Sequence, residues 1–135
     1  VDVTIRPMTP AATAGESEIR MAVDRPRAGE RLSGAITVAG WALDPQAWTG
    51  SGIDAVHVWA QRVDAPSVAP QFLGAAALDG SRPDVAKVYG PTFGAAGFSL
   101  TTDALDPGTY DVTVFVWNRR TARWEDARTV ALTIR

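Results

Sequence analysis

The sequence predicts an all-β domain in which two sheets pack face to face, with about seven strands and one short helix near residues 82–89. Short runs of alternating apolar and polar residues recur along the chain, and Gly, Pro and Asp separate them. Alternation with period two is typical of strands that bury one face in a shared interior. The length of 135 residues suits a single domain of this kind.

The alternating runs extend from residue 19 to residue 134, and each of them predicts a strand. Their apolar members are Ile19, Met21 and Val23; Ile36 and Val38; Val56, Val58 and Ala60; Phe98 and Leu100; Tyr110, Val112, Val114 and Val116; and Val130, Leu132 and Ile134. The apolar run 72–78 predicts a further connecting or edge strand. Gly40, just after the second run, indicates a bulge or the close approach of another backbone.

Residues 81–89 interrupt the strand pattern and predict the short helix. Ser81 is followed three residues later by Asp84, and Pro83 falls in the first turn, which together form a helix-start signal. Gly90 and Pro91 then end the helix.

The first 17 residues differ from the rest, so we expect an N-terminal arm or linker strand over 1–17 and the sandwich over 18–135. Val1, Val3 and Ile5 alternate like a strand, but two prolines and a stretch of small residues follow. Because proline cannot continue a central strand, this arm is expected to be an edge strand or a segment that pairs with something else.

The most specific local pattern is D-P-G-T-Y-D-V at 106–112, just before and within the clearest alternating run. Asp106, Gly108 and Tyr110 match the tyrosine corner of immunoglobulin domains, in which the tyrosine hydroxyl bonds back to the upstream backbone. Val112 stands where the immunoglobulin pattern has its disulfide cysteine. The pattern therefore predicts an immunoglobulin-like β-sandwich without the disulfide.

Further motifs give the chain a resemblance to a known group of domains. They are V-A-G-W-A-L-D at 38–44, V-H-V-W at 56–59, S-R-P-D-V-A at 81–86 and P-G-T-Y-D-V at 107–112. With these motifs the chain resembles the immunoglobulin-like repeats of large secreted or cell-surface bacterial proteins, from residue 17 to residue 135. The resemblance implies an extracellular or cell-surface location and a spacer or adhesive role, and it implies no catalytic residues.

Composition argues against several classes of partner. Thirteen basic and fifteen acidic residues give a net charge of -2 without long runs of either sign, which disfavours nucleic acid and anionic membranes as partners. No stretch approaches the ~20 apolar residues of a membrane span. The chain contains no cysteine, which excludes disulfides and thiolate metal sites.

Reactive residues form no convincing site in the sequence, so we expect no enzyme, no cofactor and no metal. His57 is the only histidine, no G-x-S-x-G elbow accompanies it, and it is expected on a strand surface. A pair of carboxylates for glycoside hydrolysis remains conceivable. However, Asp44, Asp54, Asp79 and Asp106 stand beside Gly, Pro or Ser, where aspartate commonly caps turns.

Aromatic residues supply the candidate functional surface. If the valines of 56–58 and 112–116 face the core, alternation sends His57, Trp59, Phe115 and Trp117 to the opposite face of one sheet. A contiguous apolar patch of this kind usually marks an interface. The N-terminal arm, a neighbouring domain or subunit, or sugar rings are its possible occupants. In a different register, Trp59 would instead be a core tryptophan.

The remaining tryptophans are expected near loops. Trp41 and Trp48 flank a turn-rich loop and are expected to plug one end of the sandwich. Trp124 is expected between the last two strands, where Arg120 could form a cation–π pair with it.

We therefore expect a non-catalytic structural or assembly module of an extracellular bacterial protein or filament. Its expected partners are neighbouring domains or identical subunits, in which Val1, Val3 and Ile5 make arm contacts. The alternative is a carbohydrate-binding module that uses the exposed aromatics on one sheet face, with polysaccharide as its partner.

Overall fold

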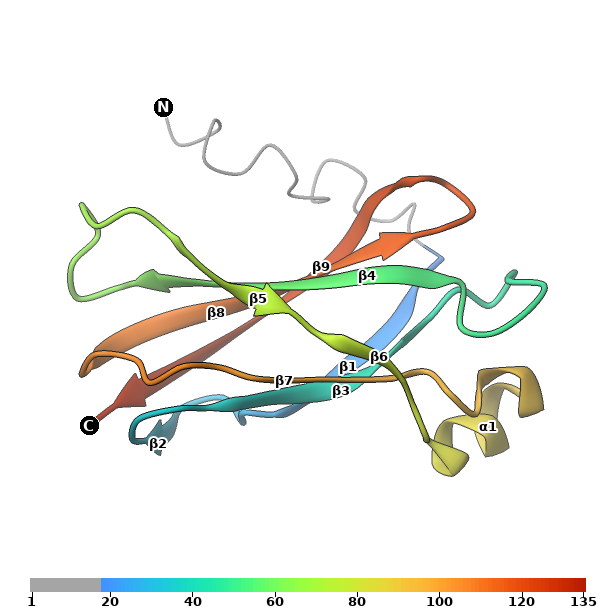
Figure 1. Cartoon of the computed structure of the whole chain (residues 1–135), viewed down its shortest axis with the longest axis horizontal. Helices are drawn as coiled ribbons and strands as arrows, with labels where there is room; N and C mark the ends of the chain where they lie inside the picture. Colours follow the sequence, from blue (N-terminus) through green and yellow to red (C-terminus); the bar gives the residue numbers. More distant parts are fainter. Residues whose placement is uncertain (1–17) are drawn as a thin grey trace.

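A computed structural model of the chain describes residues 18–135, which form two sheets packed in layers (Figure 1). The four-stranded sheet has the order β1 (Arg20–Arg25), β3 (Thr37–Leu43), β7 (Gly97–Thr101) and β6 (Ala77–Gly80). The five-stranded sheet has the order β2 (Glu30–Leu32), β9 (Arg123–Ile134), β8 (Gly108–Asn118), β4 (Ile53–Arg62) and β5 (Gln71–Ala75). All paired strands are antiparallel except β2 and β9, which run parallel. The predicted immunoglobulin-like sandwich is confirmed.

The described residues contain nine strands, two more than the sequence predicted, because two runs divide between the sheets. The apolar run 72–78 becomes β5 at one edge of the five-stranded sheet and β6 at one edge of the other. Ala76 lies at the crossing point, where its N–H donates to the Val56 carbonyl oxygen over 2.8 Å. The short β2 follows β1 in the same way and pairs with β9. Changes of sheet of this kind leave no trace in an alternation pattern.

The main core lies between the sheets and consists of the residues that the alternation predicted. Val38, Val56, Val58, Val112, Val114 and Val116 are buried there together with Phe98, Leu132 and Ile134. Burial of a valine side chain contributes on the order of 1.5–3 kcal/mol. This row of alternating residues is therefore the main source of the stability of the sandwich.

The tyrosine of the corner joins this core through its ring and bonds to the backbone through its hydroxyl. Tyr110 is buried, and its Oη donates a 2.7 Å hydrogen bond to the carbonyl oxygen of Asp106. Arg62 lies over the ring at 5.6 Å from its centroid, and its Nη2 donates to the Pro107 carbonyl oxygen. A side chain added at Gly108 would collide with this guanidinium group. The start of β8 is thus held by two hydrogen bonds, one from Tyr110 to Asp106 and one from Arg62 to Pro107.

Gly40 provides the close backbone approach that the sequence indicated. A Cβ atom at this position would overlap the carbonyl oxygen of Ala22 on β1 and would press on the Phe98 ring at 3.0 Å. Any larger residue would therefore separate β3 from β1.

The predicted helix is α1 (Pro83–Tyr89), and it packs with the 3-10 turn η3 (Pro91–Phe93) at one end of the sandwich. A second small core forms there from Leu43, Val85, Phe93 and Ala96. Pro83 and Asp84 lie in the first turn of the helix as predicted, but Ser81 does not cap it, because the N-cap is Arg82 and no side chain caps it. Asp84 instead accepts hydrogen bonds from the Arg82 guanidinium at 2.8 and 3.0 Å. The helix ends at Gly90 as predicted.

The arm residues Val1, Val3 and Ile5 lie outside the described residues.

Candidate functional site

The outer face of the five-stranded sheet carries the predicted aromatic residues, because the register of β4 and β8 is the expected one. Val58 and Val114 are cross-strand partners in the core. His57 and Phe115 are the next pair along the strands, so they lie on the outer face. By the same alternation Trp59 and Trp117 lie on that face, and the alternative of a core Trp59 is wrong, since its neighbours Val58 and Ala60 fill the core.

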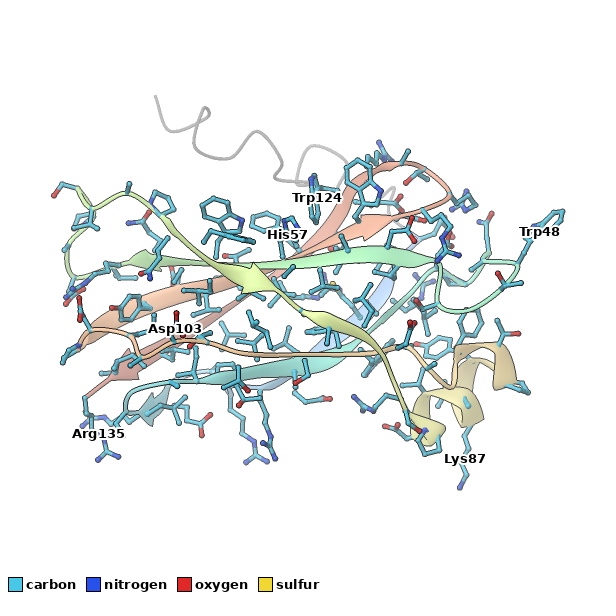
Figure 2. All side chains as sticks on the ribbon, viewed as in Figure 1. Trp48, His57, Lys87, Asp103, Trp124 and Arg135 are labelled. Carbon is cyan, nitrogen blue, oxygen red and sulfur yellow. The ribbon has the colours of Figure 1, made fainter. Side chains whose placement is uncertain are left out.

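Five aromatic side chains on this face form a chain of ring contacts, and we call them the aromatic row. Its members are Trp59 and His57 on β4, Phe72 on β5, Trp117 on β8 and Trp124 on β9. Figure 2 labels two of them, His57 and Trp124. The ring centroids are 5.2 Å apart for Trp59 and Phe72, 5.2 Å for Phe72 and His57, 4.6 Å for His57 and Trp124, and 5.3 Å for Trp124 and Trp117. The row therefore crosses four neighbouring strands.

Phe115 lies on the same face but is not exposed. Only 6% of its surface is accessible, and it lies between its cross-strand neighbours His57 on β4 and Ala127 on β9. Phe115 thus supports the row from the sheet side and does not present a free surface.

The sequence missed two members of the row, Phe72 and Trp124. Phe72 was placed in a strand, but nothing showed which strand would lie beside it. Trp124 was expected in a loop, whereas it lies in β9, where a bulge opposite Val116 and Trp117 shifts the register. The extra residue reverses the alternation, so Trp124 faces outward while Glu125 is buried. Arg120, which could have paired with Trp124, donates its Nε to Asp44 Oδ2 over 2.7 Å.

Phe72 is the most exposed ring of the row. Phe72 is 47% exposed on β5, which is the last strand of its sheet, whereas the other four rings are half-buried. The Trp59 ring contacts Phe72. The Nε1 atom of this indole is buried and has no hydrogen-bond acceptor among residues 18–135. A buried indole N–H without an acceptor is uncommon in folded proteins.

The rings of the row are not parallel, and this limits what they can bind. Successive rings are inclined by 50° to 79°, so they do not form one flat platform. Burial lowers the pKa of His57, so this ring is neutral at pH 7 and behaves as part of the apolar surface.

A second feature is a buried polar network at the end of the sandwich where the described chain begins. The backbone N–H of Glu18 donates to Glu125 Oε2, and Asn118 Nδ2 donates to Glu125 Oε1. Asn118 Oδ1 accepts the N–H of Arg120, whose Nε donates a 2.7 Å bond to Asp44 Oδ2. We call this end the entry end, and the network fixes the loops 44–52 and 118–122 there.

Asp44 is the innermost charge of this network, with a fully buried side chain. Burial by itself would raise its pKa, but hydrogen bonds from Arg120 and from the Gln46 N–H outweigh that effect and lower the pKa. The Gln46 contact to Asp44 Oδ1 is the turn-capping role that the sequence predicted. Asp54 has a different role, since it lies within β4 and pairs with Arg119 at 2.8 Å.

The two tryptophans expected to plug the sandwich end behave differently from each other. Trp41 packs against the second core and contacts Tyr89 of α1 at 5.7 Å between ring centroids. The expectation for Trp48 is wrong, because its side chain is 95% exposed at the tip of the loop 44–52 (Figure 2).

Residues 18–135 contain no group of three or more His, Asp or Glu side chains placed to hold a metal ion. None of the helices in this part of the chain has the length and apolar character needed to cross a membrane.

Comparison with known proteins shows similarity to solved structures only. No protein-family model and no curated protein matches the chain. It is similar to CopC from Methylosinus trichosporium OB3b, at 11% identity and a TM-score of 0.48 over 85% of this chain and 93% of that one. It is also similar to fibronectin(III)-like modules of Clostridium thermocellum CbhA, at 12% identity and a TM-score of 0.45 over 85% and 94% of the chains.

A β-glucosidase from Listeria innocua matches over 88% of this chain but over only 16% of its own length, at 14% identity and a TM-score of 0.47. At these low values the fold assignment rests on the strand order and the buried core described above. Membership of the bacterial repeat group that the sequence resembles stays a prediction.

Proposed function

We propose that this chain is a non-catalytic assembly module of an extracellular bacterial protein or filament. The aromatic row and the edge of β5 that no strand of residues 18–135 pairs with bind a neighbouring copy. The observation that carries the proposal is the position of Phe72. It is the half-exposed end of a continuous row of rings and lies on the last strand of the sheet.

The composition of the face supports a protein partner. Aromatic residues are enriched in the cores of protein interfaces, and tryptophan is the commonest residue at energetic hot spots. Three of the five tryptophans of the chain belong to the row. No helix or strand of residues 18–135 lies across this face (Figure 1).

The proposed occupant is the stretch 1–5 of a neighbouring copy. A strand added to the edge of β5 would form main-chain hydrogen bonds with it, which is a general mode of association. Val1, Val3 and Ile5 alternate, so they would point to one side of the added strand and extend the apolar surface beside Phe72.

The point where the described chain begins favours an arm from another copy. Glu18 is held at β9 by its bond to Glu125, and β8 and β4 separate β9 from β5 in the sheet. The arm of the same chain would have to cross the row to reach the free edge. The arm of a neighbour can approach that edge directly.

Deletion of residues 1–15 tests the proposal. The full chain is expected to associate in a concentration-dependent manner in sedimentation velocity, and the deleted chain is expected to remain a single-chain particle. The double substitution Val3→Ser, Ile5→Ser keeps the length and should also abolish association. A full chain that stays monomeric, with tryptophan fluorescence that changes on deletion, would show an arm folded on its own domain and would contradict the proposal.

Carbohydrate binding on this sheet face stays the alternative prediction. Sugar rings stack best on exposed flat surfaces, and the inclination of the rings within the row disfavours that use.

A further inference from the structure

Trp48 is the most exposed large apolar side chain among the described residues, and its loop holds it there. The loop 44–52 is closed by the Asp44 N–H, which donates to the Ser51 carbonyl oxygen over 2.8 Å, and by the Ala47 N–H, which donates to the Asp44 carbonyl oxygen over 2.9 Å. Gly52 lies at φ 80°, where a Cβ atom would meet that of Ala47 at 2.7 Å. The indole is therefore presented by a folded loop and is 95% exposed.

Two arginines from the opposite loop line the same cavity as Trp48. The backbone N–H of Arg119 donates to the Gly52 carbonyl oxygen over 2.9 Å, which joins the two loops. Arg119 Nε donates to Asp54 and Arg120 Nε donates to Asp44. Both guanidinium groups are thus positioned through Nε, while their terminal amino groups make no hydrogen bond within residues 18–135.

The two loops enclose a shallow cavity of about 260 Å³, which is lined by Gln46, Ala47, Trp48, Thr49, Gly52, Arg119 and Arg120. Ligand pockets usually begin at roughly 300 Å³, so this one has room for a single ring. Its wall combines one apolar aromatic face with the donors of two arginines. An arginine fork binds a planar carboxylate through two parallel hydrogen bonds.

We propose that this cavity binds a carboxylate-bearing sugar ring, a hexuronate unit of an acidic polysaccharide. The C–H face of the pyranose ring packs on the Trp48 indole, and the ring carboxylate accepts hydrogen bonds from the terminal amino groups of Arg119 and Arg120. Asp44 and Asp54 balance the arginine charges, and the whole chain carries -2, so the affinity comes from these local contacts and not from long-range attraction.

This site is separate from the aromatic row and does not depend on the proposed assembly. The row lies on the outer face of the five-stranded sheet, whereas Trp48 lies on a loop at the entry end. An assembly module with such a site would attach the assembled protein to an acidic polymer.

Titration with trigalacturonate tests the proposal, with the full chain followed by calorimetry and by the indole N–H resonances in ¹H–¹⁵N spectra. Saturable binding is expected, and the Trp48 resonance should shift. Trp48→Ala should weaken binding by at least about tenfold, which is about 1.4 kcal/mol. Trp48→Phe should retain part of the affinity, because it keeps an aromatic face.

Two controls separate the parts of the site. The methyl ester of trigalacturonate has the same rings without the charge and should bind at least about tenfold more weakly. Arg119→Gln should cause a similar loss while the protein stays folded, since its partner Asp54 is a surface residue. Ser99→Ala, on the outside of the four-stranded sheet, should leave uronate binding unchanged.

The proposal is overturned if the full chain does not bind trigalacturonate at millimolar concentration, if Trp48→Ala binds as the parent does, or if the ester binds as well as the acid.

Discussion

The outer faces of the two sheets differ sharply, although both sheets bury the same kind of alternating residues inside. On the four-stranded sheet the outer side chains are mostly small or polar, such as Thr37 and Thr101, whose hydroxyls are 3.2 Å apart. Its one large ring, Trp41, is covered by α1 through Tyr89. On the five-stranded sheet no helix of the described residues covers the aromatic row, and Phe72 is 47% exposed.

The two outer faces differ in whether another element of the chain covers their aromatic side chains. Where the four-stranded sheet carries an aromatic residue on its outside, the chain supplies its own cover. Where the five-stranded sheet carries the aromatic row, no described element covers it. Large exposed apolar patches are rare on monomeric proteins, and for this reason the proposed partner is assigned to the second face.

The largest effect is expected for Phe115→Ala on the five-stranded sheet. Phe115 is 6% exposed and supports the row, so its truncation leaves a cavity and should lower the free energy of unfolding by about 3 kcal/mol. Urea unfolding measures this loss. Thr113→Ala, on the same strand and face, removes only an exposed contact to Thr129 and should cost well under about 1 kcal/mol. Equal losses would mean that the outer face contributes no packing.

A somewhat smaller effect is expected for Trp41→Ala on the four-stranded sheet. The side chain is partly buried against the second core and α1, so its removal should lower the free energy of unfolding by about 2 kcal/mol. Thr37→Ala, on the same strand and face, is the matched control and should have little effect. If Trp41→Ala is as silent as its control, α1 does not act as a cover, and the contrast between the two faces is lost.

The next effect is a dependence of stability on pH that originates in the aromatic row. Burial lowers the pKa of His57 in the folded state below its ordinary value of 6.5. As the pH falls below 6.5 the unfolded chain takes up this proton first, so stability is complete above that pH and declines below it. His57 is the only histidine, so the substitution His57→Phe should flatten the decline in unfolding curves between about pH 7.5 and about pH 5.5. An unchanged slope would place the imidazole outside the row.

The smallest effect is expected for Trp48→Ala. Because the indole is 95% exposed, its loss should change the free energy of unfolding by no more than about 0.5 kcal/mol. Trp59→Ala, which removes a half-buried ring of the row, should cost about 2 kcal/mol. Thermal unfolding of the two variants compares the stability that the packed Trp59 ring contributes with that of the exposed Trp48 ring. Similar losses of stability in the two variants would contradict this difference.

The sequence predicted those parts of the molecule that depend on local alternation. The core valines, the short helix and the outward positions of His57 and Trp59 all follow from period two and from turn residues. These features need only the side-chain direction within one strand. The pairing of neighbouring strands then places the rings together.

The missed parts depend on contacts between distant segments. The bulge in β9 turns Trp124 outward, and only the partner strand reveals it. Glu125 and Asn118 form a buried pair at 3.1 Å, which an alternation of apolar residues does not disclose. Trp48 was expected to be buried at the sandwich end because it is apolar. The exposure of a loop residue depends, however, on whether another segment packs over the loop.

The most direct test of the central claim, that the aromatic face binds a neighbouring copy, places one charge on each outer face. Phe72→Glu alters the exposed end of the row, and Ser99→Glu alters an exposed position on the outside of the four-stranded sheet. Sedimentation velocity over a range of concentrations should show Phe72→Glu as a single-chain particle and Ser99→Glu associating as the parent does. Association of Phe72→Glu at the parent's concentrations would contradict the account.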